Sequence, residues 1–332
     1  MTYTDIRLAI FGAGRWGMNH IRTAASLLPH ENILVYDIDT GAEEKVQGIS
    51  ENIRFFTNDQ PVTQTGDFNA AIVATPAETH YDIAKLLLRA GKHVLVEKPI
   101  TLNVPHAEEL HSLSTEHNLK LMVGHVLLYH PAVARMKQEI ENGRIGRLQY
   151  IYSNRLNLGK IRSEENILWS FAPHDISIIQ YLIGDNPVEV SAHGGDFVQN
   201  GIEDTTLTFL KYRENIKVHI FVSWLHPFKE QRMVIIGDKG MFVFEDSIKT
   251  EKLKFYEKGF KTINGTIEKF EKEYTVVDFE SMMPLAKEHE HFYNAIVNDT
   301  MPITDGKHAV DVLKILADAT KSLAGTAVLN NA

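Results

Sequence analysis

A glycine-rich turn follows the first apolar run of the chain and limits the possible folds more than any other feature. The run IRLAIF (residues 6–11) predicts a buried strand, and GAGRWG follows it in the pattern G-x-G-x-x-G. Between a strand and a helix, this pattern allows a tight turn, close approach of a pyrophosphate and close packing of the helix on the strand. It predicts a dinucleotide-binding βαβ unit. The candidate cofactor contacts in the turn are Gly12, Gly14, Arg15, Trp16 and Gly17.

An acidic residue in the next predicted strand indicates which dinucleotide fits. The run ILVYDID (residues 33–39) contains Asp37, which stands 20 residues after Gly17. An acid at this spacing accepts hydrogen bonds from the adenine ribose hydroxyls. Its charge would repel a 2′-phosphate, so the sequence predicts NAD rather than NADP. Asp39 competes for this role, although Asp37 is nearer the end of the strand.

Polar residues stand at or just after the ends of two further predicted strands. These strands are AAIVAT (residues 70–75) and HVLVEKP (residues 93–99). Open parallel sheets bind ligands beyond the carboxyl ends of their strands, so these residues are expected to line the cofactor. Glu97 and Lys98 would place a carboxylate and an amine near the nicotinamide, and the alternative is a surface ion pair between them. The candidate cofactor contacts here are Thr75, Pro76, His80, Glu97 and Lys98.

The pattern of the chain changes near residue 124. Before it, short apolar runs alternate with helical segments such as residues 81–91 and 106–118, which is typical of a doubly wound parallel sheet. After it, segments rich in Val, Ile, Phe and Tyr recur with turns between them and predict a large, open, mainly antiparallel sheet. Helices at about 284–298 and 306–323 close the chain. We therefore expect an α/β protein with a Rossmann domain (1–124) and an α+β domain (125–332).

Composition excludes several classes of protein. Lys and Arg number 34 against 43 Asp and Glu, and this net charge of −9 disfavours nucleic acid and anionic lipid as partners. Without cysteine, neither disulfides nor thiolate metal sites can form. His289 and His291 are two apart in a predicted helix and so face different sides, and no metal is expected. The N-terminal segment lacks the features of a signal peptide and no apolar run could span a bilayer, so a cytoplasmic protein is predicted.

These motifs resemble the Gfo/Idh/MocA oxidoreductases, which include glucose–fructose oxidoreductase and inositol dehydrogenase. The resemblance covers nearly the whole chain, through GAGRWG, Asp37, residues 74–99 ending in EKP, GHVLLYHPAV (124–133) and APHDISIIQYLIG (172–184). It implies an NAD-dependent dehydrogenase acting on CH–OH groups. It further implies that Lys98 contacts the reacting hydroxyl, that His174 is the acid/base, and that the open sheet serves to form a dimer or tetramer.

The residues themselves give His174 a plausible role. It begins the apolar run HDISIIQYLIG, where His174, Ile178 and Tyr181 share a helix face. A neutral imidazole can take the alcohol proton as hydride leaves the same carbon. Asp175 is better placed to cap or orient this turn than to react. For an isolated histidine at a helix start, the alternative is a capping or core role.

Two departures from the family pattern concern the substrate. Many members have Asp four positions before the histidine, where this chain has Ser170, and many have Arg in the segment that follows His125. The stretch from Ser153 to Asp175 is polar and cationic, and its donors could bind a diphosphate. The alternative is a solvated loop. The candidate substrate contacts are His125, Arg155, Asn157, Lys160, Arg162, Ser170 and Asp175.

That stretch is similar to its counterpart in a branch of the family that oxidises the 3-hydroxyl of UDP-N-acetylglucosamine, or of its uronic acid, on the way to 2,3-diamino sugars of surface polysaccharide. A UDP-sugar is therefore the expected small-molecule partner. An inositol or free-sugar dehydrogenase is the first alternative. The second is a sensor that binds NAD without turnover, because fold alone does not establish chemistry.

Overall fold

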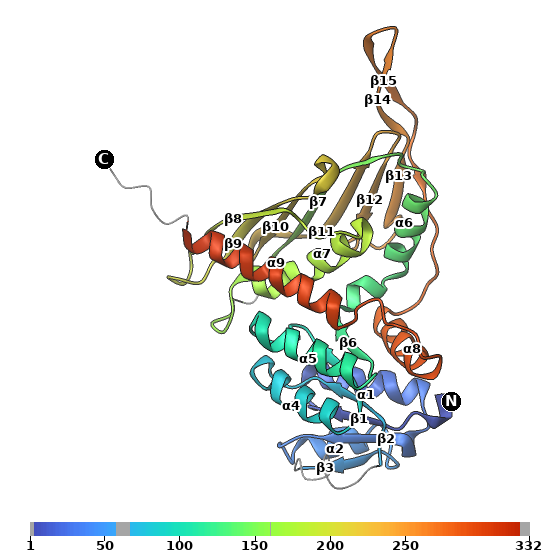
Figure 1. Ribbon diagram of the computed structural model, residues 1–332, viewed down its shortest axis with the longest axis vertical. Helices are drawn as coiled ribbons and strands as arrows, with labels where there is room; N and C mark the ends of the chain where they lie inside the picture. The colour runs from blue at the N-terminus through green and yellow to red at the C-terminus, as the bar shows by residue number, and fades with distance from the viewer. Residues whose placement is uncertain (1–2, 58–66, 160, 326–332) are drawn as a thin grey trace. The chain divides into compact units, whose positions relative to one another are not determined.

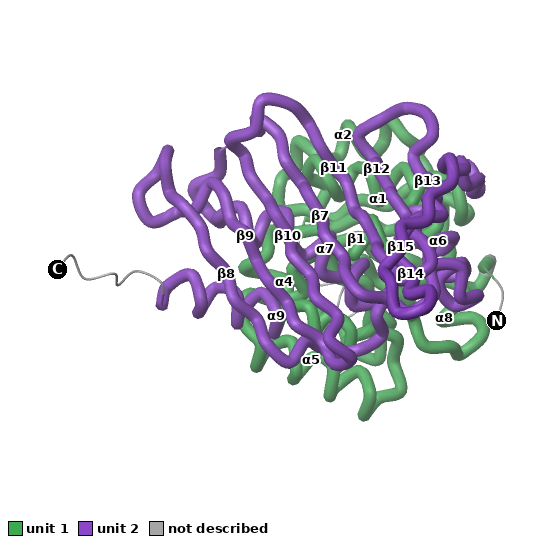
Figure 2. The backbone as a smooth tube through the Cα atoms, turned by 90° about the horizontal axis from the view of Figure 1, so that it is seen from above, with its two compact units in different colours: residues 1–129, 282–313 green, residues 130–281, 314–332 purple. Residues whose placement is uncertain are grey.

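Residues 3–57, 67–159 and 161–325 are described by the computed structural model, which divides into two units (Figures 1 and 2). Unit 1 combines residues 1–129 with Met282–Leu313, and unit 2 combines residues 130–281 with 314–332. The chain therefore passes from one unit to the other three times. Each unit has its own sheet.

Unit 1 is built on a six-stranded sheet in the order β3-β2-β1-β4-β5-β6. Every neighbouring pair is parallel. Four of the strands are buried at every residue, as expected where helices cover both faces of a parallel sheet. This strand order is the doubly wound Rossmann arrangement, which confirms the predicted fold. The strands are β1 (Leu8–Phe11), β2 (Ile33–Tyr36), β3 (Arg54–Phe56), β4 (Ala70–Val73), β5 (His93–Glu97) and β6 (Leu121–Gly124).

The helices of unit 1 begin where short-range signals place them. In α5, the side chain of Asn103 accepts a hydrogen bond from the backbone N–H of His106, and Pro105 occupies the first turn. This cap starts the helix two residues before the predicted 106. Pro76 precedes α4, which begins four residues before the predicted 81. The helices are α1 (Arg15–Leu27), α2 (Ala42–Gln47), α4 (Ala77–Arg89), α5 (Val104–Glu116) and α8 (Pro284–Val297), with short 3₁₀ turns η1 (Tyr3–Asp5), η2 (His30–Asn32) and η3 (Val126–Tyr129).

The predicted domain division needs correction for helix α8. Residues 125–332 were expected to form one domain, but Met282–Leu313 belong to unit 1 and the first division falls after Tyr129. Phe292 and Tyr293 of α8 are fully buried in the hydrophobic core that Ile21 of α1 also joins. Burial of two aromatic side chains contributes several kcal/mol, about 1.5–3 for each large apolar side chain. A long-range contact of this kind leaves no signal in local sequence pattern.

Unit 2 contains an eight-stranded sheet in the order β16-β13-β12-β11-β7-β10-β9-β8. Its neighbouring strands are antiparallel except for the parallel pair β7–β10. The mainly antiparallel character is therefore as predicted. The strands are β7 (Leu148–Leu158), β8 (Glu189–Gly195), β9 (Thr205–Lys211), β10 (Lys217–Ser223), β11 (Leu225–Gly237), β12 (Met241–Glu245), β13 (Leu253–Tyr256) and β16 (Thr275–Val276).

Helices cover one face of this sheet. In β7 the buried residues Ile151, Ser153 and Arg155 alternate with more exposed ones, which is the pattern of a sheet packed on one side. Helix α7 contacts β7, β9 and β10. The Trp169 indole of α7 donates to Thr320 of α9 at 3.0 Å. The helices are α6 (Pro131–Glu141), α7 (Ile167–Ile183) and α9 (Gly306–Gly325, whose first residues belong to unit 1), with a 3₁₀ turn η4 (Arg213–Asn215).

A two-stranded ribbon, β14 (Lys258–Ile263) and β15 (Thr266–Glu271), extends from the edge of unit 2 that carries β13 (Figure 1). Its strands pair only with each other. Phe260 and Ile267 are exposed on it. Sequence analysis did not separate this ribbon from the strands before it.

Over the described ranges, no helix is both long and apolar enough to cross a membrane. Within the same ranges, no group of three or more His, Cys, Asp and Glu side chains is arranged to hold a metal ion.

Candidate active site

The glycine turn, residues 12–17, has three glycines with three different functions. Gly12 has φ +96°, and a Cβ there would lie 2.6 Å from the carbonyl oxygen of Ala74. A Cβ on Gly17 would lie 1.9 Å from the carbonyl oxygen of Gly12, so α1 packs directly against the turn. Gly14 has nothing within 4 Å of its Cβ position, and it caps the N-terminus of α1. This open approach to the backbone amides of a helix start fits the pyrophosphate of NAD.

Asp37 lies directly after β2 and contacts the glycine turn. Its carboxylate accepts the backbone N–H of Ala13 at 2.5 Å and that of Asp39 at 2.8 Å. The competing residue, Asp39, instead accepts the N–H of Gly41 at 2.9 Å, before α2. Asp37 is therefore the acid at the glycine turn, where an adenine ribose would be held.

Exchange of Asp37 for serine is expected to shift the cofactor preference toward NADP. The change removes the negative charge that repels a 2′-phosphate and the acceptor for the ribose hydroxyls. We expect NADH affinity to fall about ten- to a hundredfold and NADPH affinity to rise, because one charge-assisted hydrogen bond is worth roughly 1.5–3 kcal/mol. Quenching of protein fluorescence by each reduced cofactor measures both constants. An Asp39→Ser variant is the matched control, and a loss of NADH affinity in it alone would transfer the role to Asp39.

His80 joins the two loops that follow β4 and β5. It is almost completely buried in α4, and its ring nitrogens lie 2.9 Å from the carbonyl oxygen of Thr75 and 2.8 Å from that of Pro99. A neutral imidazole has one N–H and satisfies one of these carbonyls, whereas a doubly protonated ring satisfies both. Thr75 itself accepts the hydroxyl of Thr79 at 2.7 Å. His80 thus holds the loops of the cofactor edge together rather than projecting from them.

Glu97 is the buried centre of polar contacts in unit 1. Its carboxylate accepts the indole N–H of Trp16 and the backbone N–H of Lys98, the latter at 3.1 Å, and lies 2.8 Å from Nε2 of His20. The pKa of Glu97 is lowered: burial by itself would raise it, but the hydrogen bond from His20, aided by Trp16 and Lys98, overcomes that effect. The surface ion pair considered for Glu97 and Lys98 is therefore wrong, because Glu97 is buried.

The room for this carboxylate comes from Gly124, the partner of Glu97 in the β5–β6 pairing. A Cβ at Gly124 would lie 2.9–3.0 Å from the carboxylate atoms of Glu97. Lys98, the next residue, is half-buried. The position of Lys98 at the end of β5 thus depends on a carboxylate that is enclosed by the strand next to it.

A buried histidine, His125, lies near Lys98, and the half-buried His308 contacts its ring. The imidazoles of His125 and His308 meet edge to face with ring centroids 5.6 Å apart. Burial, then the charges of His308 and Lys98, hold the pKa of His125 well below its usual value. Its Nδ1 accepts no hydrogen bond and donates none within the described part of the chain. His125 is therefore a neutral ring near Lys98, which suits a contact to a substrate hydroxyl.

In unit 2, Arg155 and Asp175 pair with each other in the interior. The Arg155 Nε and Nη2 donate to the two carboxylate oxygens of Asp175 at 2.7 and 3.0 Å, and Ser153 donates to the same carboxylate at 2.6 Å. Arg155 and Asp175 were both expected to contact substrate; both are buried, and this pairing uses two guanidinium nitrogens of Arg155 and both carboxylate oxygens of Asp175. Their pairing fixes β7 to the helix that carries His174.

Replacing Asp175 by leucine is expected to destabilise the protein by about 3–5 kcal/mol, because it leaves the Arg155 guanidinium buried without a counter-charge. The midpoint of urea denaturation would report the loss. The double variant Arg155→Met/Asp175→Leu removes both charges and should recover much of the stability. If both variants have the same urea midpoint as the wild type, the pair has no structural function.

The other predicted substrate contacts in unit 2 have varied surroundings. His174 is half-buried in α7, and its carbonyl accepts the hydroxyl of Ser177 at 2.9 Å. Ser170, one turn earlier, is buried. Arg162 is partly exposed and donates to Glu165 at 2.5 Å. The Asn157 side-chain oxygen is buried and accepts no hydrogen bond from the described residues. Lys160 lies outside the residues that the structure describes.

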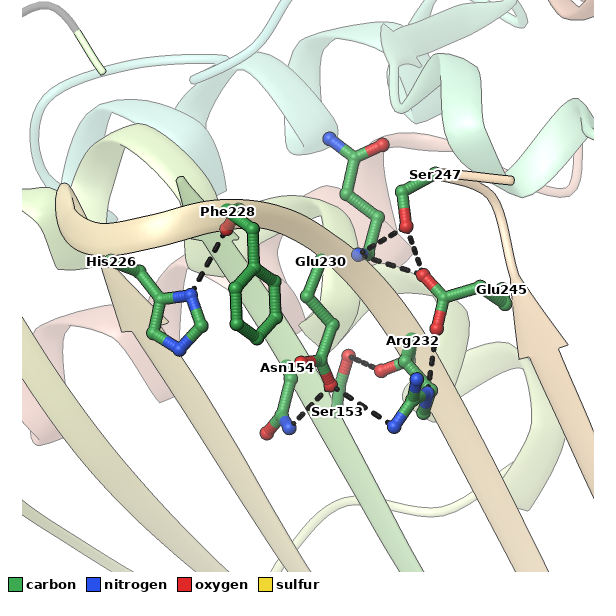
Figure 3. Close-up of polar contacts among 9 residues, drawn as sticks. Ser153, Asn154, His226, Phe228, Glu230, Arg232, Glu245 and Ser247 are labelled. Atoms are coloured by element: carbon green, nitrogen blue, oxygen red, sulfur yellow. Dashed lines mark hydrogen bonds and ion pairs between the residues drawn. The ribbon is translucent and has the colours of Figure 1, made fainter. Parts of the chain in front are cut away.

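The face of the unit 2 sheet that carries Asn154 bears a row of polar side chains (Figure 3). Asn154 donates to Glu230 at 2.9 Å, and Arg232 donates to Glu245 at 2.6 Å and also pairs with Glu230 at 3.5 Å. These side chains pair among themselves across β7, β11 and β12. This row is poorly suited to bind a diphosphate, because the charge of Arg232 is already paired with Glu230 and Glu245.

Sequence analysis missed three members of the buried cluster around Glu97. His20 lies in α1, and Glu288 and His289 lie in α8; all three are fully buried. The only local signal was their position on the apolar faces of two helices, where titratable residues are rare. His289 was considered only for metal binding, and its contact is instead with His20, at 2.8 Å.

Glu288 has neither carboxylate oxygen in a hydrogen bond to any described residue. Burial, and then the charge of Glu97, raise its pKa well above the usual value. The folded protein therefore keeps this proton to a higher pH than the unfolded chain, which releases it above about pH 4.5. Because the unfolded state then binds fewer protons, stability is lost as the pH rises from about 4.5 toward the folded-state pKa.

A Glu288→Gln variant should remove this loss. We expect its melting temperature to match that of the wild type near pH 4.5 and to exceed it increasingly toward pH 8, because glutamine has no proton to release. Melting curves across this range provide the test. The same difference at every pH would contradict a protonated Glu288.

Comparison with known proteins gives matches along most of the chain. The model of the oxidoreductase family with an NAD-binding Rossmann fold, Gfo/Idh/MocA, matches residues 6–125, and that of the Gfo/Idh/MocA C-terminal domain matches residues 133–243. The UDP-N-acetylglucosamine 3-dehydrogenase of Acidithiobacillus ferrooxidans is 26% identical over 91% of this chain and 92% of its own. Its solved structure superimposes with a TM-score of 0.82 at 25% identity, covering 96% of this chain and 98% of the other.

Other relatives are named for inositol. The scyllo-inositol 2-dehydrogenase (NAD(+)) of Bacillus subtilis is 27% identical over 71% of this chain and 72% of its own. The structure of scyllo-inositol dehydrogenase from Lactobacillus casei with bound NAD(H) and scyllo-inositol has a TM-score of 0.77 at 19% identity, covering 96% of this chain and 97% of that one, and it shows the shared fold. With the glycine turn, Asp37 and the two matched models, the chain belongs to the Gfo/Idh/MocA family of NAD-dependent oxidoreductases.

Proposed function

We propose that the protein oxidises the 3-hydroxyl of UDP-N-acetylglucosamine to a ketone. The observation that carries this proposal is the extent of similarity. The relative named for that reaction matches 91% of this chain, whereas relatives named for inositol oxidation match 60% and 71% at the same level of identity. A substrate with a nucleotide portion also agrees with the absence from this chain of the Asp and Arg that mark many family members, at Ser170 and after His125.

Lys98 and His174 have separate tasks in this proposal. Lys98 donates a hydrogen bond to the oxygen of the reacting hydroxyl, and the imidazole of His174 takes the proton of that hydroxyl. Bound NAD supplies the hydride acceptor. The C–H and O–H bonds of the alcohol break and a C=O bond forms, so one hydride and one proton leave the sugar. His125 is neutral and near Lys98, and it contacts the sugar without adding a second positive charge beside Lys98.

Binding of the diphosphate cannot rest on Arg155, whose guanidinium pairs with Asp175. Arg162 is partly exposed, and we propose that it binds the diphosphate. Lys160 is proposed for the same role from the sequence alone. Asn157 offers an amide near them in the chain. We further propose that the protein acts as a homodimer or homotetramer in the cytoplasm, and that a 2,3-diamino sugar pathway consumes the ketone.

NADH absorbance on mixing the protein, NAD and UDP-N-acetylglucosamine tests the substrate. Parallel reactions contain the uronic acid analogue or myo-inositol, and an aminotransferase removes the ketone so that the equilibrium does not limit the signal. Absorbance that rises with the UDP-sugar supports the proposal. Absorbance that rises only with the uronate or inositol replaces it by that reaction. Cofactor binding without turnover of any of the three favours a sensor.

A further inference from the structure

The polar cluster around Glu97 extends inward from the cofactor edge through three side chains. Nε2 of His20 lies 2.8 Å from the Glu97 carboxylate, and Nδ1 of His20 lies 2.8 Å from Nε2 of His289. Nδ1 of His289 lies 3.1 Å from the hydroxyl of Tyr293. His20, His289 and Tyr293 are completely buried. We refer to these three residues as the histidine chain.

The donors and acceptors in the histidine chain can be assigned from Glu97 inward. Trp16 and the backbone of Lys98 only donate to the carboxylate, so Glu97 is an acceptor throughout and Nε2 of His20 carries a proton. With a neutral His20 ring, Nδ1 of His20 accepts from Nε2 of His289. Nδ1 of His289 then accepts the hydroxyl proton of Tyr293. All three donors therefore point toward Glu97.

The environment supports this assignment. Burial is the largest cause that holds the pKa of His289 well below its usual value, so that ring has a single N–H. Burial, with a contribution from Tyr3, raises the pKa of Tyr293, so its hydroxyl keeps the proton. The reverse arrangement would need a charged His20, with His289 donating to the Tyr293 oxygen.

Glu288 faces the same cluster. Its carboxyl group stays protonated, so Glu97 holds the negative charge of the cluster. The carboxyl of Glu288 has no donor among the described residues, whereas Glu97 has three. Two carboxyl groups in one buried site share a single charge, and the one with donors takes it. Against the opposing effect of burial, the positive charge of Lys98 also helps to lower the pKa of Glu97, after the larger contribution of His20.

We propose that the histidine chain is a positioning device, whose hydrogen bonds all point toward Glu97 and fix the carboxylate that ties Trp16 of the glycine turn to Lys98. Trp16 and Lys98 occupy the two parts of unit 1 that would contact the pyrophosphate and the nicotinamide. Glu97 connects these parts directly, and the histidine chain anchors Glu97 to α8. None of the three residues of the chain contacts substrate in this proposal.

The direction of the chain is measurable by nuclear magnetic resonance. Long-range ¹H–¹⁵N correlation spectra distinguish a ring protonated at Nε2 from one protonated at Nδ1 or at both. We expect His20 and His289 each to carry a proton at Nε2 and none at Nδ1. An Nδ1–H tautomer or an imidazolium at His20 would overturn the assignment.

The positioning role needs a second measurement, on variants. Gln at position 289 can donate to His20 and accept from Tyr293, whereas Leu can do neither, so His289→Leu should shift the Trp16 indole resonance and weaken NADH binding about tenfold. His289→Gln should keep NADH affinity within about twofold. His291→Gln, on the same helix but outside the chain, is the control. A Trp16→Phe variant identifies the indole signal.

If His289→Leu does not fold, Tyr293→Phe removes the terminal donor alone and should move the Trp16 signal in the same direction. A folded His289→Leu or Tyr293→Phe protein with unchanged Trp16 resonance and NADH affinity would overturn the proposal. Because both readouts use NADH rather than a sugar, they do not depend on the proposed substrate.

Discussion

Replacement of Lys98 by methionine should lower kcat by about a thousandfold, since a positioned proton donor or acceptor contributes roughly 10²–10⁴-fold. Methionine keeps the length of the side chain and removes its charge and donors. NADH affinity should stay within about twofold, because the backbone N–H of residue 98 still donates to Glu97 in the variant. Turnover under saturating substrate and a separate NADH titration distinguish these two effects.

His174→Ala is expected to lower kcat by a similar factor, and its activity should no longer fall as the histidine becomes protonated at low pH. Lys45→Met is the matched control for Lys98, because Lys45 is an exposed lysine of α2. If the Lys98→Met and His174→Ala proteins each turn over within a few-fold of the wild type, the proposed roles of both residues are wrong.

The second large effect concerns the glycine turn. Gly17→Ala should destabilise unit 1 by about 3 kcal/mol, the upper end of the usual cost of overpacking, because the added Cβ would lie 1.9 Å from the carbonyl oxygen of Gly12. Relief of this contact moves α1, whose first amides would bind the pyrophosphate. NADH affinity should therefore fall together with the melting temperature.

Gly14→Ala separates these two consequences. Nothing lies within 4 Å of its Cβ position and its φ is −64°, which alanine adopts without strain. The melting temperature should stay close to that of the wild type, while NADH affinity falls about tenfold or more because the methyl group occupies the approach of the pyrophosphate. A Gly14→Ala protein that binds NADH normally would show that the pyrophosphate does not approach the turn there.

Local patterns predicted the first βαβ unit of unit 1 well. The strand, the glycine turn, helix α1 and Asp37 lie within one βαβ unit, so their spacing in sequence fixes their spacing in the fold. The structure places Asp37 on the turn, with the Ala13 hydrogen bond that distinguishes it from Asp39. The two sheets and the last two helices were also predicted, because each has its own periodicity.

Partners from distant segments were not predictable in the same way. His20 and His289 are 269 residues apart, and nothing in either local pattern indicates the other. Arg155 illustrates a related limit. A cationic stretch before His174 favoured a diphosphate site, but strand alternation in β7 turns Arg155 inward to Asp175. Composition gives the charges of a segment and does not tell which of them are already neutralised within the fold.

The return of α8 to unit 1 limits how this protein could be divided or recombined. A fragment ending at Tyr129 would contain the glycine turn, Asp37 and Lys98, and would still lack the segment that buries one side of α1. His20 would lose its His289 partner. Unit 1 is thus encoded by two separate segments of the chain. A hybrid with another family member would have to exchange residues 1–129 and 282–313 together.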